Sequence, residues 1–233
     1  MRKEWHVGIV IPARNEQEFI GTVIESIPDF VDKIIVVNDG SSDNTKKIVE
    51  EKINAKNKIE LINLAGEGVG RAIDCGHQYL LDNLQKPFVS VVMAGDGQMD
   101  VEDLPHVIEP IIQEQTDHVK GNRFHHPDGT GNMPATRKLA SKLLGFFTTL
   151  AAGRQVTDPQ CGYTATSHIV LENWNWNVSW KGYGYPNYWL IEMSKKSFRL
   201  TEVPVKSVYA NEKSGIKNFS FFISVGLMML VMH

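Results

Sequence analysis

The sequence contains little cysteine and no excess of positive charge. Its 233 residues include two cysteines, Cys75 and Cys161, which lie far apart and lack the spacing of metal ligands. No segment shows the pattern of a secretory signal, so we expect both thiols to be free in a reducing, cytoplasmic setting. The formal net charge of -3 argues against binding nucleic acid through bulk electrostatics. Any phosphate group must therefore be bound by a few local residues.

The sequence also lacks the phosphate-binding motifs of two large nucleotide-binding classes. It has no Gly-Lys-Ser/Thr phosphate loop. The segment 66–72 (GEGVGRA) is rich in glycine. A dinucleotide fingerprint, however, follows the first strand of its domain, and no glycine directly follows the first predicted strand here, which ends at Pro12. A nicotinamide-dependent enzyme is therefore disfavoured. We expect segment 66–72 to be a turn that enters a helix, with Arg71 facing a ligand.

The apolar C-terminal run is too short to span a membrane. Phe219–Met232 is uncharged and mostly apolar, but its 14 residues would form a helix about 21 Å long, against about 30 Å of hydrocarbon. It fits an interfacial helix, a truncated transmembrane helix or a helix packed on the domain. Lys206, Lys213 and Lys217 precede it and can meet anionic headgroups. We divide the chain into a domain at 1–217 and an apolar segment at 218–233.

The first hundred residues alternate between strand and helix patterns. Short β-branched runs predict strands at His6–Pro12, Lys33–Val37, Ile59–Asn63, Phe88–Met93 and His118–Gly121. Helical periodicity predicts helices at Glu16–Ile27, Asp43–Ile53, Gly70–Leu84, Val101–Gln115 and Thr136–Ala152. This alternation predicts an α/β domain whose mainly parallel sheet is covered on both faces. The tryptophan-rich segment Asn173–Trp189 suits core packing better than a ligand wall.

Polar residues follow three of the predicted strands, at 12–16, 38–43 and 94–100. Because the carboxyl ends of parallel strands meet at one edge of a sheet, we expect these segments to share a crevice. Asp39 is placed to accept hydrogen bonds from a base or ribose, although a turn and helix cap explains the same segment. Asp96, Gln98 and Asp100 offer three oxygen donors of the kind that Mg²⁺ and Mn²⁺ prefer. A cation there would neutralise the charge on a leaving diphosphate.

Seven motifs occur in the order seen in one family of enzymes: PARNE (12–16), VVNDGSSDNT (36–45), GVGRA (68–72), VVMAGDGQMDVEDLP (91–105), VKGNR (119–123), DPQCGYTA (158–165) and EVPV (202–205). In these motifs the chain resembles family-2 glycosyltransferases with the GT-A fold. It most resembles the branch of dolichol-phosphate mannose synthases and related polyprenyl-phosphate glycosyltransferases. The resemblance covers about residues 6–217. It implies a three-layer α/β/α domain with a mixed, mainly parallel sheet, and a metal-dependent hexosyltransferase that inverts the anomeric centre.

The resemblance also implies where the donor and the metal bind. Residues at the family's nucleotide-sugar positions are Pro12, Ala13, Glu16 and Asp39, to which we add Arg14, Arg71 and Asp96. Asp96 and Gln98 match the second Asp and the Gln of the family's D-x-D-x-Q metal motif. Ala94 replaces the first Asp and leaves the metal, Mg²⁺ or Mn²⁺, with fewer protein ligands. We expect Asp100 or water to complete the shell, or the metal to depend on bound diphosphate.

For the acceptor, the chemistry separates two possibilities. A sugar hydroxyl needs a general base, whereas a phosphate monoester is already ionised and needs cations to position it. Arg123, Arg137 and Lys213 lie at or near the family's phosphate-binding positions, and Asp158 is a candidate base or orienting group. With Asp96, we assign Asp158 and Arg123 to catalysis.

We therefore expect transfer of a sugar to a polyprenyl phosphate at the cytoplasmic face of a membrane, with no nucleic-acid partner. One alternative is transfer to a carbohydrate hydroxyl with Asp158 as base. Another is a non-catalytic nucleotide-sugar binding protein, which Ala94 makes conceivable.

Overall fold

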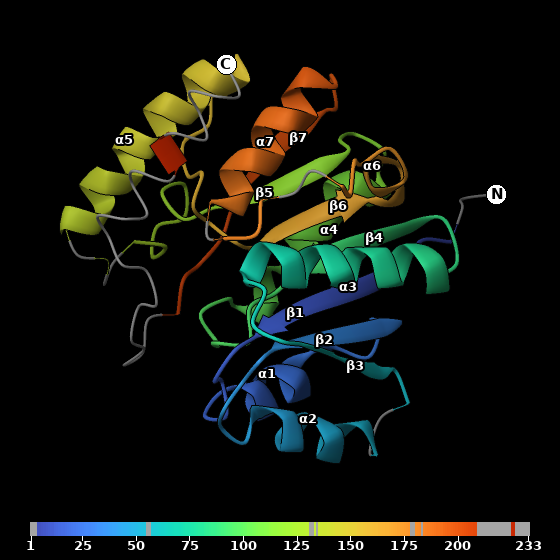
Figure 1. Cartoon of the computed structure of the whole chain (residues 1–233). Coiled ribbons are helices and arrows are strands. Elements are labelled where there is room, and N and C mark those ends of the chain that lie inside the picture. Colours follow the sequence, from blue (N-terminus) through green and yellow to red (C-terminus); the bar gives the residue numbers. More distant parts are fainter. Residues whose placement is uncertain are drawn as a thin grey trace.

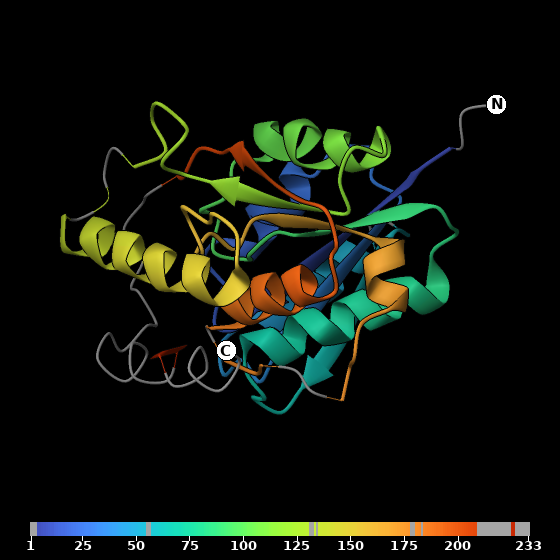
Figure 2. The same cartoon turned by 90° about the horizontal axis from the view of Figure 1, so that it is seen from above.

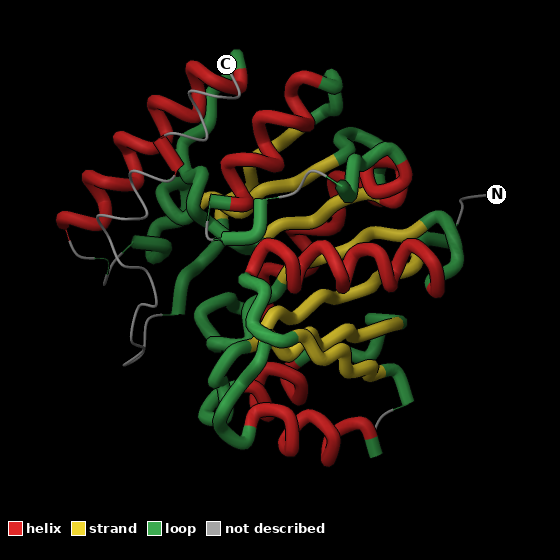
Figure 3. Tube along the Cα trace, viewed as in Figure 1, coloured by secondary structure: helices red, strands yellow, loops and turns green. Residues whose placement is uncertain are grey.

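The computed structural model describes residues 4–54, 57–130, 133, 135–177, 180–182, 184–208 and 225–226, with the backbone alone at 136 and 137. The described strands are β1 His6–Ala13, β2 Lys33–Asp39, β3 Ile59–Leu64, β4 Phe88–Val92, β5 His118–Asn122, β6 Thr164–Ser167 and β7 Leu200–Pro204. The described helices are α1 Ile20–Ser26, α2 Thr45–Ile53, α3 Val69–Asn83, α4 Leu104–Ile112, α5 Ala135–Ala152, α6 His168–Glu172 and α7 Tyr185–Lys195. A short 3₁₀ turn, Val101–Asp103, precedes α4. Figure 1 labels these elements, and Figure 3 separates helices from strands by colour.

The described strands form one seven-stranded sheet in the order β3-β2-β1-β4-β6-β5-β7. Strands β3, β2, β1 and β4 pair in parallel, as do β5 and β7. Strand β6 runs antiparallel to both of its neighbours, β4 and β5. The predicted mixed, mainly parallel sheet is confirmed, and the polar segments after β1, β2 and β4 leave the sheet at the same edge.

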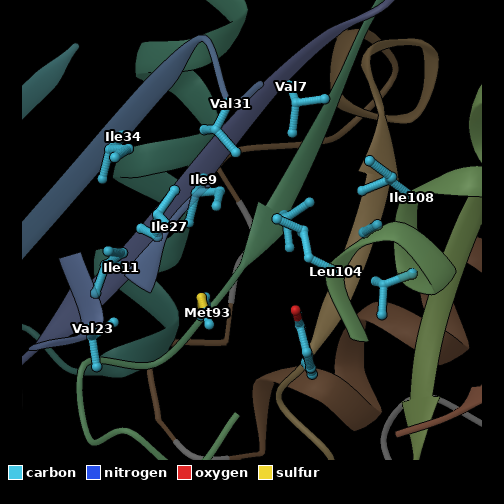
Figure 4. Packing of buried hydrophobic residues seen from close by; sticks show 14 of the residues in the cluster. Val7, Ile9, Ile11, Val23, Ile27, Val31, Ile34, Met93, Leu104 and Ile108 are labelled. Atoms are coloured by element: carbon cyan, nitrogen blue, oxygen red, sulfur yellow. The ribbon is translucent and has the colours of Figure 1, made fainter. Parts of the chain in front are cut away.

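Helices cover both faces of the sheet, with α1, α2 and α4 on one side and α3, α6 and α7 on the other (Figures 1 and 2). The strands divide their side chains between two cores because successive residues of a strand point to opposite faces. In β1, Ile9 and Ile11 enter the core under α1 and α4, while Val10 enters the core under α3. Figure 4 shows Ile11 beside Val23 of α1, and Ile9 and Leu104 of α4 in the same core. Each such fully buried aliphatic side chain stabilises the fold by about 1.5 to 3 kcal/mol.

Helix α3 packs unusually close to β1 because each element carries a glycine at the contact. A Cβ atom on Gly76 would lie 2.3 Å from Cγ1 of Val10, and one on Gly8 would lie 2.6 Å from Cδ2 of Leu80. Larger residues at these two positions would force the helix away from the sheet. The close packing fixes where the N-terminus of α3 meets the carboxyl edge of the sheet.

The five predicted strands are confirmed, but β6, β7, α6 and α7 were not predicted. Strand β6 is only four residues long, TATS, and has no run of large apolar residues. The predicted helix Val101–Gln115 is a 3₁₀ turn followed by α4, which ends at Ile112. The core interpretation of the tryptophan-rich segment is confirmed, because Trp174 and Trp189 stack at 3.9 Å in the buried cluster under α7.

Most of the apolar C-terminal segment 218–233, together with Lys213 and Lys217, lies outside the described residues. Of that segment the structure describes Val225 and Gly226, and Val225 is buried against Gly184 at the start of α7. Among the described helices, none is both long and apolar enough to cross a membrane. The division into a domain at 1–217 and an appended segment therefore stays a prediction.

Candidate active site

The loops that follow β1 and β2 are joined by hydrogen bonds between side chains and backbone. The amide of Asn15 donates to Oγ of Ser41 (3.0 Å), and the amide of Ser42 donates to Oδ1 of Asn15 (2.8 Å). The amide of Glu16 donates to Oγ1 of Thr45 (2.8 Å). Asn15 adopts a positive φ of 59°, a conformation that asparagine tolerates better than most residues. The two loops therefore form a single wall at the carboxyl edge of the sheet.

The turn after β4 joins the same wall. The amide of Gly95 donates to the carbonyl of Pro12 (3.2 Å), so this turn continues the pairing between β4 and β1. A Cβ atom on Gly95 would lie 3.3 Å from Cβ of Ala13, so the turn that carries Asp96 lies against the end of β1. The predicted convergence of three strand ends on one region is confirmed.

Asp39 organises the turn that precedes α3. Its buried carboxylate accepts hydrogen bonds from the amides of Glu67 (2.6 Å) and Gly68 (2.9 Å). The guanidinium of Arg14 lies near the same carboxylate, with Nη1 4.0 Å from Oδ2. A carboxylate has about four lone-pair sites, so Asp39 can accept a further hydrogen bond from a ligand. Its predicted contact with a base or ribose stays a prediction.

The glycines of the 66–72 segment have a tertiary cause that the sequence did not reveal. A Cβ atom on Gly70 would lie 1.9 Å from the carbonyl oxygen of Trp180, and one on Gly68 would lie 2.4 Å from that of Lys181. The amide of Gly70 donates to the carbonyl of Lys181 (2.8 Å). The glycines thus let the segment before α7 cross the first turn of α3. Arg71 is half-buried beside this crossing, with its Nε 3.6 Å from Glu67.

The proposed metal ligands lie on the turn after β4. Asp96 and Gln98 are half-buried, and Oδ1 of Asp96 accepts a hydrogen bond from the amide of Gln98 (3.0 Å). Asp100 instead caps the next turn, accepting from the amide of Glu102 (3.1 Å), and lies 3.6 Å from Nζ of Lys206.

The donor set of this turn limits how a metal can bind. Within the described ranges, no three His, Cys, Asp or Glu side chains gather closely enough to hold a metal ion. Mg²⁺ is commonly held by one or two carboxylates plus substrate phosphates, and Asp96 with Gln98 fits that mode.

Arg123 and Asp158 form a buried bidentate ion pair directly after β5. Nε and Nη2 of Arg123 each lie 2.8 Å from an oxygen of Asp158, and the amide of Arg123 donates to Oδ2 (3.0 Å). Burial alone would raise the pKa of Asp158, but the hydrogen bonds and charge of Arg123 outweigh it and lower that pKa. A carboxylate with a lowered pKa is a weak proton acceptor. The geometry therefore favours a structural role for Asp158 over the role of general base.

Sequence reasoning missed a polar network beside this pair. Glu202 accepts hydrogen bonds from the amide of Thr157 (3.0 Å), from its hydroxyl (2.5 Å) and from Nδ2 of Asn122 (2.7 Å). Nζ of the buried Lys120 donates to the carbonyl of Cys161. These residues stand in or next to the motifs VKGNR, DPQCGYTA and EVPV. That position is the one feature of the sequence that could have indicated a role for them. Their pairing joins segments as far as 80 residues apart.

The predicted three-cation phosphate site is not assembled within the described atoms. Arg123 is buried on Asp158, while the side chain of Arg137 and all of Lys213 lie outside the described part of the chain. The assignment of these cations to an acceptor phosphate stays a prediction.

Comparisons with known proteins agree with the resemblance. Residues 8–174 match the model of the family "Glycosyl transferase family 2". The chain is 33% identical over 222 residues to a Methanococcus voltae protein named UDP-N-acetylglucosamine–dolichyl-phosphate N-acetylglucosaminyltransferase, covering 87% of this chain and 86% of the relative. It is 27% identical over 221 residues to polyprenol monophosphomannose synthase of Mycolicibacterium smegmatis, covering 91% of this chain and 80% of that protein.

A solved structure shares the fold. Glucosyl-3-phosphoglycerate synthase from Mycobacterium tuberculosis, in complex with Mn²⁺, uridine diphosphate and phosphoglyceric acid, has a TM-score of 0.68 and 19% identity. The likeness covers 98% of this chain and 77% of that one. It shows that this chain has the GT-A fold.

Proposed function

The chain belongs to glycosyl transferase family 2, and from that premise we propose that it moves a sugar from a nucleotide-diphosphate donor to a polyprenyl phosphate of the dolichyl type. The observation that carries the proposal is the similarity, over most of both chains, to a relative named for a dolichyl-phosphate acceptor. A second relative, named for a polyprenol product, supports the same acceptor class. We place the enzyme at the cytoplasmic face of a membrane, where such an acceptor resides.

We propose that the donor occupies the crevice at the carboxyl edge of the sheet. The residues proposed to line it are Pro12, Ala13, Arg14, Glu16, Asp39, Arg71 and Asp96. Asp96 and Gln98 would hold Mg²⁺ or Mn²⁺, which supplies charge neutralisation to the diphosphate as it leaves. The presence of Mn²⁺ with uridine diphosphate in the solved structure of the same fold supports the use of a divalent cation. Arg14, near Asp39 and largely exposed, is available to meet a phosphate oxygen.

The state of Asp158 supports a phosphate acceptor over a hydroxyl acceptor. A phosphate oxygen is already ionised, so it attacks the anomeric carbon without losing a proton, and the bond from that carbon to the diphosphate oxygen breaks with inversion. The nucleoside diphosphate departs with the bonding electron pair. A hydroxyl acceptor would need a base, and Asp158 is held by Arg123 with a lowered pKa. We assign Asp158 to positioning Arg123 at the acceptor end of the site.

The proposal is tested with the whole chain, a panel of nucleotide sugars and matched acceptors. A thermal-shift screen with Mn²⁺ first selects the donor, because a ligand that binds the folded state alone raises its stability. Transfer is then measured to a polyprenyl phosphate and to the corresponding free polyprenol. We expect transfer to the phosphate, none to the alcohol, and loss of transfer with EDTA.

Two results would overturn the proposal. Transfer to a sugar hydroxyl without transfer to any lipid phosphate would assign the chain to the hydroxyl-acceptor class. Donor binding without turnover on any acceptor would make it a nucleotide-sugar binding protein.

A further inference from the structure

Helix α5 carries a stripe of large apolar side chains on its outer face. We define the α5 stripe as Leu139, Leu143, Phe146, Phe147 and Leu150, whose exposed fractions lie between 47% and 71%. Their spacing of four, three, one and three residues places them on one side of a helix. The α5 stripe contains most of the strongly exposed large apolar side chains in the described part of the chain; Phe30, Ile169 and Val208 are the others.

The opposite face of α5 is the one that packs on the domain. Ser141, Leu144 and Thr148 are buried, and Nδ2 of Asn187 in α7 donates to Oγ1 of Thr148 (2.6 Å). Both views place α5 next to α7 and away from strands β1 to β4 (Figures 1 and 2). The α5 stripe is therefore a second apolar face, in excess of what the core requires. Contiguous exposed apolar surface of this kind marks an interaction site.

The charges of α5 indicate what binds there. The helix sequence, ATRKLASKLLGFFTTLAA, contains three basic residues and no acidic one. Lys142 is exposed and Lys138 half-exposed. An amphipathic helix with Phe and Leu on one face and basic residues beside them suits the surface of an anionic bilayer, because the apolar side chains enter the acyl boundary while the cations meet headgroups.

A groove lies between α5 and the chain segments that adjoin Arg123 and Asp158. It is open, has a volume of about 750 Å³, and is lined on one side by Lys142 and Phe146 of α5. Its other walls include Phe124, His125 and Thr157. Thr157 precedes Asp158, the partner of Arg123, in the chain. The groove thus has apolar and cationic residues of α5 on one side and chain neighbours of the buried ion pair on the other, which suits an amphiphilic phosphate that leaves a membrane.

We propose that the α5 stripe is a membrane-docking surface that seats the domain on an anionic lipid bilayer, with the groove opening toward the lipid. The surface is distinct from the apolar segment 218–233. The proposal rests on the proposed function for its biological setting, but lipid binding is measured without turnover.

The test compares two triple variants with the unchanged chain in co-sedimentation with phosphatidylcholine vesicles, with and without phosphatidylglycerol. The stripe variant is Leu139→Gln, Leu143→Gln and Phe147→Gln, which leaves the groove residue Phe146 in place. The control variant is Phe30→Gln, Ile169→Gln and Val208→Gln, which removes exposed apolar side chains elsewhere. We expect the stripe variant to bind anionic vesicles more weakly by about tenfold or more, because three apolar side chains no longer enter the acyl boundary. The control variant should bind as the unchanged chain does.

A charge reversal provides a second measurement. Lys138→Glu removes one positive charge and adds a negative one, so it should weaken binding to anionic vesicles about thirtyfold and leave binding to neutral vesicles unchanged. Unchanged vesicle binding by the stripe variant, or an equal loss in the control variant, would overturn the proposal. So would gel filtration showing a dimer that the stripe variant dissociates while its vesicle binding persists, which would identify a second copy as the partner.

Failure of the proposed function gives a different result. If the chain transfers sugar to no lipid phosphate, the proposed function fails while the vesicle measurement still stands. If both proposals hold, the stripe variant loses transfer to long-chain acceptors in vesicles but keeps transfer to a short-chain, water-soluble prenyl phosphate.

Discussion

The donor side and the acceptor side of this molecule are held together in different ways. On the donor side, the exposed Asn15 and the half-buried Ser41 bond to the backbone of neighbouring loops, as does the buried Thr45. On the acceptor side, a buried ion pair and a carboxylate network join β5, β7 and the loop before β6. The first arrangement tolerates solvent and substrate, while the second depends on excluding water.

This difference separates the expected effects of substitution. A buried charge that loses its partner costs several kcal/mol of folding free energy, because it keeps its desolvation penalty. A polar group at the rim of a crevice can instead be removed with little change in folding and a large change in ligand binding. We therefore expect stability defects on the acceptor side and binding or catalytic defects on the donor side.

The largest expected effect tests the acceptor side. Asp158→Ala should lower the free energy of unfolding by about 3 to 5 kcal/mol, since it leaves Arg123 buried without its carboxylate. The double variant Arg123→Met with Asp158→Leu should recover most of that loss. Urea denaturation measures both. The matched control is Arg199→Met, which removes an equally bidentate but exposed partner of Asp117 and should cost far less. Equal losses for the buried and exposed pairs would refute the comparison.

The next effect tests the donor side. Asp96→Ala should lower transfer by about a hundredfold or more at saturating Mn²⁺, while the melting temperature stays unchanged, because the half-buried carboxylate contributes ligation and not packing. Asp100→Ala is the control: its carboxylate caps the turn before α4, so most of the activity should remain. Full activity of Asp96→Ala in the presence of EDTA would remove the metal from this turn.

A smaller effect is expected at the turn before α3. Asp39→Ala strands the amides of Glu67 and Gly68 and should weaken binding of the nucleotide by about 1 to 3 kcal/mol. Calorimetry measures the affinity. The control Asp43→Ala removes a carboxylate that bonds Gln17 and Thr45 instead, and should change the affinity less. Unchanged affinity of Asp39→Ala for every nucleotide would exclude Asp39 from the site.

The smallest expected effect is on the pH dependence of folding stability, through a buried histidine between α3 and β4. His77 of α3 is buried against Oγ of Ser90 in β4 (2.7 Å), and burial lowers its pKa to about 3. Between about pH 6.5 and pH 3, His77 takes up a proton in the unfolded chain, where its pKa is near the ordinary value of 6.5, but not in the folded chain. Stability from this group is therefore complete above about pH 6.5 and is lost as pH falls.

Chemical denaturation between about pH 6 and pH 4 measures that loss. We expect His77→Gln to reduce the pH slope of the unfolding free energy by about 1 kcal/mol per pH unit. His118, whose pKa burial also lowers, should maintain part of the slope. The exposed His106→Gln should leave the slope unchanged. A His77→Gln slope identical to that of the unchanged chain would show that His77 takes up its proton in the folded chain as it does in the unfolded chain.

The donor half was predictable in detail because its signals are local. Strands β1, β2 and β4 are rich in β-branched residues, and the segments at 12–16, 38–43 and 94–100 lie at or just after their ends. The rule that parallel strands present their carboxyl ends at one edge then placed these segments together without knowledge of any contact. The position of the turn that follows β4 and carries Asp96 was predicted from that rule alone.

The acceptor half was predictable only as a set of motifs. Nothing local indicates that Glu202 accepts from Thr157 and Asn122, because those partners are 45 and 80 residues away. Strand β6 is short and polar, and it forms because β4 and β5 leave a place for it between them. Asp158 was a candidate base because it is a carboxylate. Its burial and its pairing with Arg123, which make it a weak proton acceptor, follow only from the tertiary structure.

The sequence by itself determined the sheet's parallel core, the family and the residues that gather at the edge of the sheet, because strand periodicity and turn chemistry act over a few neighbouring residues. Only the tertiary structure decided what those residues do to one another. It gave Asp39 the amides of the glycine turn, set Gly70 against Trp180 and buried Asp158 on Arg123. Such pairings depend on which distant segments exclude water from a charge, and that is a property of packing.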